Sequence, residues 1–147
     1  YAPIEVAFLN GVELADFVME FDFLQRGKDF SLRDLCVVYA YTDSLNYNFV
    51  QVASEEDKNT HNVFSVQDGT RPRKIGTPHN QGVVWGYEKW HHITIMRQTA
   101  DKTVKLFVDG ELVVESTNDV ERSGKIGIGT FGSEFKIDNL VVWGKNK

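Results

Sequence analysis

"WHHITIMRQTADKTVKLFVDGELVVES", residues 90–116, decides the fold class of this chain. Apolar and polar side chains alternate in 90–97 and again in 103–108, which is the period of a half-buried strand. Asp109-Gly110 separates the second run from 111–115, and this dipeptide predicts a tight hairpin because Gly tolerates a positive φ. The stretch therefore predicts antiparallel strands joined by short turns.

The same pattern extends outward in both directions and no segment has a helical period. Further strands are predicted at 3–9, 17–24, 35–41, 47–53, 62–67, 125–131 and 135–143. Turn signals separate them, namely Asn10-Gly11, Asp68-Gly69 and Ser123-Gly124. Short strands without intervening helices favour two antiparallel sheets packed face to face. We expect an all-β chain in which residues 1–147 form a single β-sandwich domain.

Composition limits the partners of this domain. The formal net charge is -5 and no extended basic stripe is present, so we expect no nucleic-acid partner. No apolar run approaches the roughly 20 residues of a membrane-spanning helix. The single Cys36 excludes an internal disulfide.

Two stretches carry a family resemblance, residues 90–116 and "GKIGIGTFGSEFKIDNLVVWG" at 124–144. Their signature strings are WHH at 90–92, LFVDG at 106–110, IGIG at 126–129 and IDN at 137–139. In these strings the chain resembles the laminin G-like and concanavalin A-like lectin/glucanase superfamily over roughly residues 15–143. The resemblance implies an antiparallel concanavalin A-like jelly roll in a secreted, extracellular or periplasmic protein, in which this chain is a domain of a larger whole.

Several signature residues have structural explanations. Trp90 opens a strand, and we interpret it as a sandwich-core aromatic. His91 and His92 are neighbours in a strand and must point to opposite faces, so they cannot jointly bind one metal ion.

The stretch EFDFLQ, residues 20–25, is similar to the catalytic strand of the superfamily's retaining glucanases, which carries a carboxylate nucleophile and a proton donor. Glu20 and Asp22 are in register with that motif, but Gln25 stands in the place of the proton donor. An amide cannot act as a general acid. We therefore interpret Glu20 and Asp22 as structural and reject this mechanism.

The resemblance also implies a structural calcium ion at Asp138, inside an otherwise apolar final strand. Calcium prefers several oxygen ligands, and Glu13 or Asp16 is expected to supply another. The alternative is that Asp138 forms a hydrogen bond within a local bulge.

The middle of the chain carries the predicted ligand site. In residues 60–80 several basic side chains and histidines gather around a single acid, Asp68. Aromatic and polar side chains of neighbouring strands would form the floor of a groove, and basic side chains of the following loop would overhang it. The predicted site residues are Tyr39, Tyr41, Tyr47, Gln51, His61, Arg71, Arg73, His79 and Trp85.

Such a groove suits a carbohydrate, because hydroxyls need polar partners and apolar ring faces stack on aromatics. Arginine favours carboxylate or sulfate groups, since its planar guanidinium meets them with two hydrogen bonds. This predicts a polysaccharide or oligosaccharide with anionic groups as the ligand. The alternative is that Arg71 and Arg73 only decorate a hairpin and balance the acidic residues 55–57.

Three functional classes follow. The first and favoured one is a non-catalytic, lectin-like carbohydrate-binding domain. The second is a polysaccharide lyase, a glycoside hydrolase or a 3-keto-glycoside hydrolase; for an enzyme the candidate catalytic residues are Tyr47, Gln51, His61 and Arg71. The third is a laminin G-type protein-interaction domain that uses loop-presented calcium.

Overall fold

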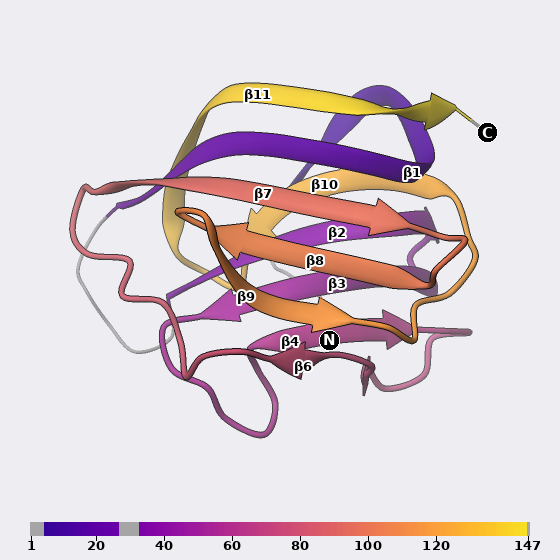
Figure 1. The fold of residues 1–147 in the computed structure, drawn as a ribbon, viewed down its shortest axis with the longest axis horizontal. Helices are drawn as coiled ribbons and strands as arrows, with labels where there is room; N and C mark the ends of the chain where they lie inside the picture. Colours follow the sequence, from indigo (N-terminus) through magenta and orange to yellow (C-terminus); the bar gives the residue numbers. More distant parts are fainter. Residues whose placement is uncertain (1–4, 27–32, 147) are drawn as a thin grey trace.

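A computed structural model of the chain describes residues 5–26 and 33–146, and every regular element in these ranges is a β-strand (Figure 1). The strands are β1 (Glu5–Arg26), β2 (Asp34–Asp43), β3 (Asn46–Ala53), β4 (Asn62–Val66), β5 (Arg73–Lys74), β6 (Thr77–Pro78), β7 (Trp90–Gln98), β8 (Thr103–Val108), β9 (Glu111–Ser116), β10 (Gly124–Thr130) and β11 (Glu134–Asn146). The predicted all-β class is confirmed. No helix in the described ranges has the length and apolar character needed to span a membrane.

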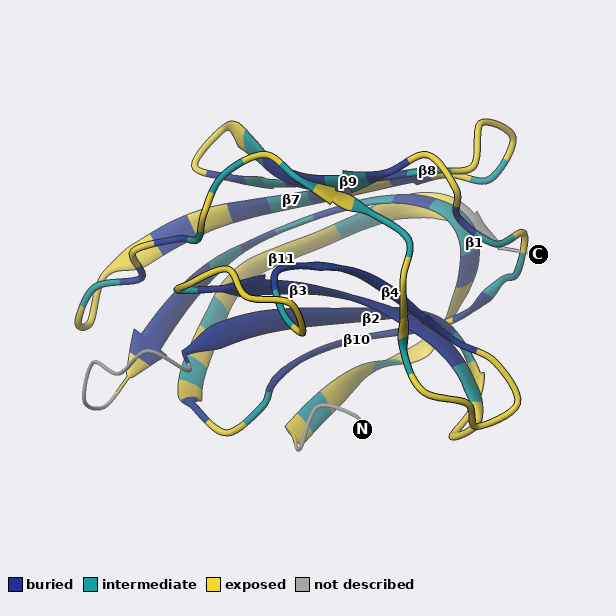
Figure 2. Cartoon of the chain, turned by 90° about the horizontal axis from the view of Figure 1, so that it is seen from below, coloured by how far each residue is buried: buried dark blue, intermediate teal, exposed yellow. Residues whose placement is uncertain are grey.

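The strands form two layers that share β1. Sheet one has the order β5-β4-β3-β2-β10 and ends on residues 5–14 of β1. Sheet two contains residues 14–26 of β1 between β11 and β7, followed by β8, β9 and β6. Figure 2 shows β7, β8 and β9 in the upper layer and β2, β3 and β10 in the lower layer. All recorded pairs are antiparallel, as predicted.

A bend in β1 connects the two sheets. The sequence predicts two strands, at 3–9 and 17–24, with a turn at Asn10-Gly11; residues 3 and 4 lie outside the described residues. That prediction is wrong, because β1 runs without interruption through Gly11, whose φ is 71°. Its pairing register with β10 shifts between Phe8 and Glu13. The Asn10-Gly11 signal therefore marks a bend from one sheet into the other rather than a chain reversal.

Alternating apolar side chains of both sheets fill the space between them. Met19, Phe21 and Ile95 are fully buried there. Trp90 is not part of this core, because the alternation of β7 turns it outward and leaves it 46% exposed. The core tryptophan is Trp85, which is 1% exposed and meets the Phe23 ring edge-on at 5.2 Å between centroids.

A second apolar cluster lies on the face of sheet one that points away from this core. Its buried members are Val38, Tyr47, Phe49, Phe64 and Val66. An antiparallel sheet commonly packs one face on a core and exposes a polar one. Sheet one is apolar on both faces, so its outer face is the first place to look for a ligand site.

Two of the predicted turns have the expected geometry. Asp68 and Gly69 have φ angles of 52° and 70°, and Asp109 and Gly110 have φ angles of 51° and 84°. Two consecutive positive φ angles are typical of the tight hairpin turns that join antiparallel strands. The turn predicted at Ser123-Gly124 is wrong, since Gly124 begins β10. There a Cβ atom would overlap the Tyr41 backbone, so close strand packing explains this glycine.

Candidate functional site

The outer face of sheet one carries a continuous row of aromatic rings. Adjacent ring centroids are 4.7 Å apart for Phe8 and Tyr41, 5.8 Å for Tyr41 and Tyr47, 6.1 Å for Tyr47 and Phe49, and 4.9 Å for Phe49 and Phe64. We call these five residues the aromatic row. Phe49 and Phe64 are buried, whereas Phe8 is 40% exposed and Tyr41 is half-buried. The row is therefore accessible to a ligand at its Phe8–Tyr41 end.

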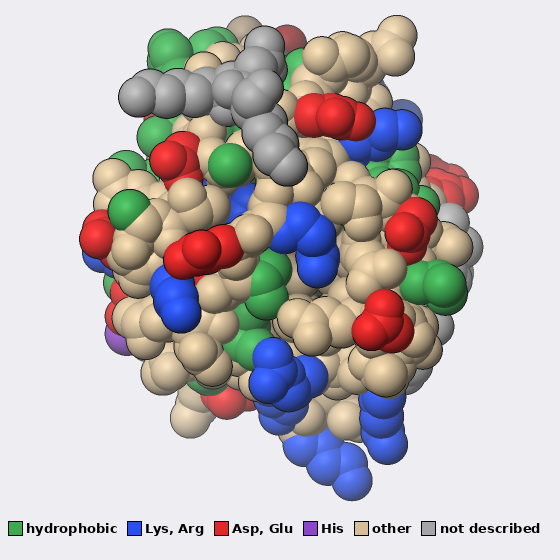
Figure 3. Space-filling view, turned by 90° about the vertical axis from the view of Figure 1, so that its right-hand side faces the viewer, with side chains coloured by type: hydrophobic (Ala, Val, Ile, Leu, Met, Phe, Trp, Pro, Cys, Tyr) green, Lys and Arg blue, Asp and Glu red, His purple; other side chains and the backbone are tan. Residues whose placement is uncertain are grey.

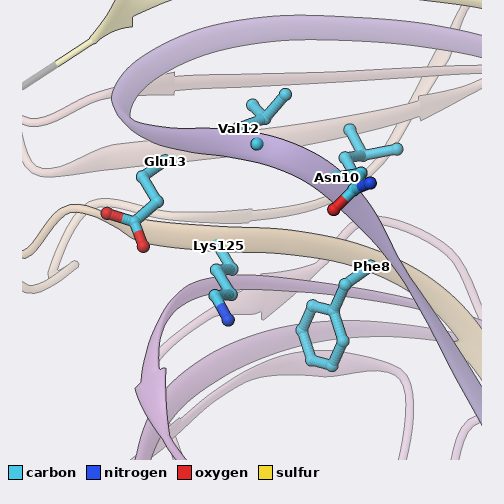
Figure 4. A pocket seen from close by; sticks show the side chains of 7 residues that line it. Phe8, Asn10, Val12, Glu13 and Lys125 are labelled. Atoms are coloured by element: carbon cyan, nitrogen blue, oxygen red, sulfur yellow. The ribbon is translucent and has the colours of Figure 1, made fainter.

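An open pocket of about 400 Å³ adjoins this end of the row, lined by residues 8–13 of β1 and by Lys125 of β10. It forms where β1 leaves its register with β10. Figure 4 shows the Phe8 ring, the Glu13 carboxylate and the Lys125 ammonium around it. Glu13 and Lys125 are cross-strand partners, yet neither forms an ion pair or side-chain hydrogen bond within the described residues. We call this space the β1 pocket; its charged groups remain available to a ligand.

Gln51 lies on the same face as Tyr47, as predicted from the alternation of β3. Its amide is already used, because Nε2 donates to Oδ2 of Asp34 at 2.8 Å. The other oxygen of Asp34 accepts the Phe131 N–H at 3.0 Å. Burial raises the pKa of Asp34, and the hydrogen bonds from Gln51 and Phe131 oppose that shift. The Gln51 amide therefore stabilises the buried Asp34 carboxylate in this structure.

Tyr39 does not share a face with Tyr41, contrary to expectation. The residue between them, Ala40, has a φ of 51°, and two residues of β2 stand opposite one residue of β10 at this point. Tyr39 keeps the alternation of Val37 and points into the space between the sheets, whereas the bulge moves Tyr41 to the outer face. The Tyr39 hydroxyl donates to Oδ1 of Asp119 at 2.8 Å. Burial raises the pKa of Tyr39, and the Asp119 charge adds to the shift.

Tyr39 belongs to a buried polar group that ties the two sheets together. Arg97 of β7 donates from Nε to Oδ2 of Asp119 at 2.8 Å, and both side chains are fully buried. Asn48 of β3 donates to Oδ1 of Asp119 at 3.0 Å. The Arg97 guanidinium also lies 4.9 Å from the centre of the Tyr39 ring. We call Tyr39, Asn48, Arg97 and Asp119 the buried clamp, and its contacts are structural.

His61 is held apart from the aromatic row. It precedes β4, so the residue that pairs with Gln51 is Asn62 rather than His61. The Ala53 N–H donates to Nδ1 of His61 at 3.1 Å, and Nε2 lies 2.7 Å from Oδ1 of Asn80. Because Nδ1 accepts, Nε2 carries the proton and the ring is neutral. Burial lowers the pKa of His61, which fits this state.

The other predicted ligand residues lie at separate places. Arg71 and Arg73 are exposed and have no ion pair within the described residues. His79 is 3.0 Å from Glu115 at the edge of sheet two. Trp85 is in the core, where no ligand can stack on it.

The basic segment does border the aromatic row. Lys74 of β5 pairs with Phe64, so these two residues share the outer face, while Arg73 pairs with Ser65. Figure 3 shows Lys and Arg side chains gathered at the lower end of the molecule, where the segment after β4 runs in Figure 1.

Glu20 and Asp22 lie on the outer face of sheet two, on either side of His92. The His92 ring is 2.9 Å from each carboxylate, through Nε2 to Glu20 and through Nδ1 to Asp22. These hydrogen bonds, first the one to Asp22 and then the one to Glu20, raise the pKa of His92. His91 points to the opposite side and binds Asp109 at 2.7 Å, which confirms the predicted divergence of the two histidines.

Solved structures of other proteins share this architecture. No protein-family model matches the sequence, and no curated protein matches it. The carbohydrate binding module CBM66 from Bacillus subtilis superposes with a TM-score of 0.70 and 16% identity, over 93% of this chain and 81% of that one. The chain has a concanavalin A-like jelly-roll fold.

Two further solved structures superpose on the same jelly roll. The homodimeric agglutinin CG-16 from chicken liver matches with a TM-score of 0.63 and 10% identity, over 95% of this chain and all of that one. Lactose- and MES-liganded congerin II matches with a TM-score of 0.64 and 7% identity, over 95% of this chain and all of that one. The superfamily resemblance seen in the sequence is thus confirmed at the level of the fold.

The predicted calcium site does not fit this jelly roll as a joint site of Asp138 and Glu13. Asp138 pairs with Asp22 in sheet two and accepts the Asn139 N–H at 2.8 Å, whereas Glu13 pairs with Lys125 in sheet one. Within the ranges that the structure describes, no three His, Cys, Asp or Glu side chains converge on a metal position. Calcium binding, the laminin G-type alternative and an extracellular or periplasmic location remain predictions.

Sequence reasoning missed Phe8 and Lys125 as site residues. The signal that would have found them is the alternation of Ile126 and Ile128 with Gly127 and Gly129. It leaves one face of β10 without side chains, and Phe8 lies across this bare surface: a Cβ on Gly127 would be 3.0 Å from its ring.

Proposed function

We propose that this jelly roll is a carbohydrate-binding domain that holds a sugar at the Phe8–Tyr41 end of the aromatic row. The observation that carries the proposal is this half-exposed aromatic pair beside the free charges of Glu13 and Lys125. An exposed ring takes the apolar face of a pyranose, while carboxylate, amide and ammonium groups bind its hydroxyls. The fold's similarity to a carbohydrate binding module and to lactose-liganded congerin II supports the same class of ligand.

The geometry favours binding over catalysis. A lyase or hydrolase that uses His61 needs a ring nitrogen free to move a proton near Tyr47. Both ring nitrogens of His61 are occupied, by the Ala53 N–H and by Asn80. Glu20 and Asp22 lie on sheet two, away from the aromatic row. We therefore infer a non-catalytic domain.

Replacing Tyr41 or Phe8 by Ala tests the site. Each change removes one stacking ring, and we expect sugar affinity to fall by about 1.5 kcal/mol, roughly tenfold. The measurement is titration calorimetry with a ligand first identified on a glycan array. Trp143→Ala is the matched control, because Trp143 is an exposed aromatic on sheet two. Equal losses in Trp143→Ala and Tyr41→Ala, or no loss in any variant, would refute the proposed site.

We further propose that the ligand is a polysaccharide with anionic groups. Arg71 and Arg73 are exposed and free of ion pairs in the described residues, and Lys74 shares the outer face with Phe64. A long anionic chain crossing the aromatic row would reach this basic border.

The variant Arg71→Ala/Arg73→Ala tests this specificity. We expect affinity for a uronate- or sulfate-bearing glycan to fall by about 1.5–3 kcal/mol for each lost contact, and affinity for its neutral counterpart to stay unchanged. Stability should change by no more than about 0.5 kcal/mol, as is usual for surface side chains. Unchanged binding of the anionic glycan would mean that the two arginines only solvate the hairpin.

A further inference from the structure

A second open pocket, of about 460 Å³, lies beside the buried clamp. Residues from β1, from the end of β2, from the turn after β7 and from the segment before β10 line it. They are Ala15, Thr42, Thr99, Ala100, Glu121, Arg122 and Ser123. Most of these side chains are small, so the Arg122 guanidinium is the largest polar group on the wall. We call this space the Arg122 pocket.

Arg122 is fixed in place without a counter-ion. Its Nε donates to the Ala40 carbonyl at 2.9 Å, and its Nη2 lies 3.3 Å from Oδ1 of Asn48. No carboxylate of the described residues lies within 4 Å of its guanidinium. The side chain is half-buried. Arg122 is thus a preorganised cation that is partly removed from water and contacts only neutral acceptors. A bound anion would stabilise such a charge.

The neighbouring charges make an anion at this position still more favourable. Arg97 contacts Arg122 directly, since its Nη1 donates to the Arg122 carbonyl at 2.6 Å. The nearby Asp119 is already committed, with Oδ2 bound to Arg97 and Oδ1 bound to two members of the clamp. Two arginines thus lie near one carboxylate, which contacts only Arg97. Burial, followed by the Arg97 charge, lowers the pKa of Arg122, while Asp119 and Asp43 oppose the shift.

We propose that the Arg122 pocket binds an oxyanion, a sulfate, phosphate or carboxylate group, on the free edge of the Arg122 guanidinium. A guanidinium meets such a group through parallel N–H donors, which a neutral ligand cannot match in charge. Ser123 also lines the pocket, and its hydroxyl supplies a further donor. Glu121, exposed at the rim, opposes the anion and sets the affinity below what Arg122 alone would give.

The pocket adjoins the proposed sugar site but does not depend on it. Thr42 follows Tyr41 directly, and Ser123 lies two residues before Lys125. The oxyanion is therefore either a free inorganic ion or an acidic group on a glycan that also reaches the aromatic row. The chemistry at Arg122 is the same in both cases.

The test is thermal unfolding and titration calorimetry with sodium sulfate and sodium phosphate, against sodium chloride at equal ionic strength. A ligand that binds the native state raises the melting temperature, and the rise follows its binding isotherm. We expect a saturable rise with sulfate or phosphate in the parent protein and an affinity at least about tenfold lower in Arg122→Met. Arg26→Met is the matched control and should bind as the parent does, since Arg26 is an exposed arginine that lies outside this pocket.

Glu121→Gln keeps the arginine and all of its hydrogen bonds, so it tests the site even if Arg122→Met folds poorly. Removing the rim carboxylate should tighten sulfate binding at least threefold. The proposal is overturned if sulfate raises the melting temperature no more than chloride does, both in the parent and in Glu121→Gln. Whether the oxyanion is inorganic or is carried by a glycan is tested with a sulfated oligosaccharide and its unsulfated form. Each is measured with the parent and with Tyr41→Ala. A glycan-borne anion loses affinity in Tyr41→Ala, whereas inorganic sulfate does not.

Discussion

His92 and His61 differ in what surrounds their rings, and this gives them opposite effects on stability. His92 lies half-exposed between two carboxylates, which favour its protonated form. His61 is buried and accepts a backbone N–H, which favours its neutral form. Protonation below the ordinary histidine pKa of 6.5 therefore supports the fold at His92 and opposes it at His61.

We expect His92→Gln to reduce the loss of stability that occurs at mildly alkaline pH. The folded pKa of His92 is raised, so its stabilising contribution is complete below pH 6.5 and disappears as the pH rises through the folded value. Urea unfolding at several pH values between 6.5 and 8.5 measures this, and the contribution of His61 is common to the parent and the variant. The parent should lose stability relative to His92→Gln across that range. Parallel pH profiles would show that the bridge has no energetic effect.

At the scale of the elements, the sequence predicted the hairpins and strands whose structure depends on local turn residues and on the two-residue alternation. The hairpin at Asp109-Gly110 and the alternation of 103–108 are confirmed, because turn chemistry and the two-residue period are properties of the strand itself. The path of β1 was not predictable from Asn10-Gly11. The same dipeptide permits a hairpin or a bend, and only pairing with β10 on one side and β11 on the other decides between them.

The predicted site failed for a related reason, since one displaced residue reverses the face of every residue after it. The bulge at Ala40 separates Tyr39 from Tyr41, and the start of β4 at Asn62 leaves His61 outside the row. Tyr41 and Tyr47 share the outer face because the register of β2 against β3 shifts between Tyr39 and Asp43. Bulges and strand ends arise from long-range pairing, so a single sequence does not locate them.

For the whole molecule, the buried clamp is a polar link between the two sheets. Arg97 and Asp119 are both fully buried, and Arg97 also donates to backbone carbonyls at Ala15, Val120 and Arg122. These hydrogen bonds replace the ones that the two charged groups would form with water. They therefore offset the cost of burying the charges. The clamp also holds Asn48 and the Arg122 backbone, so it shapes the wall of the Arg122 pocket.

Replacing Asp119 by Asn should destabilise the whole domain, because it leaves the Arg97 charge buried without a counter-charge. Losing one partner of a buried pair costs about 3–5 kcal/mol, a large share of the stability of a domain of this size. Urea unfolding followed by tryptophan fluorescence measures the change. Glu88→Gln is the matched control, because its ion pair with Arg26 is exposed and should contribute no more than about 1 kcal/mol. The double variant Arg97→Met/Asp119→Leu removes both charges and should recover part of the loss, since no unpaired charge is then buried. If Asp119→Asn is no less stable than Glu88→Gln, the two sheets are held together by their apolar core alone.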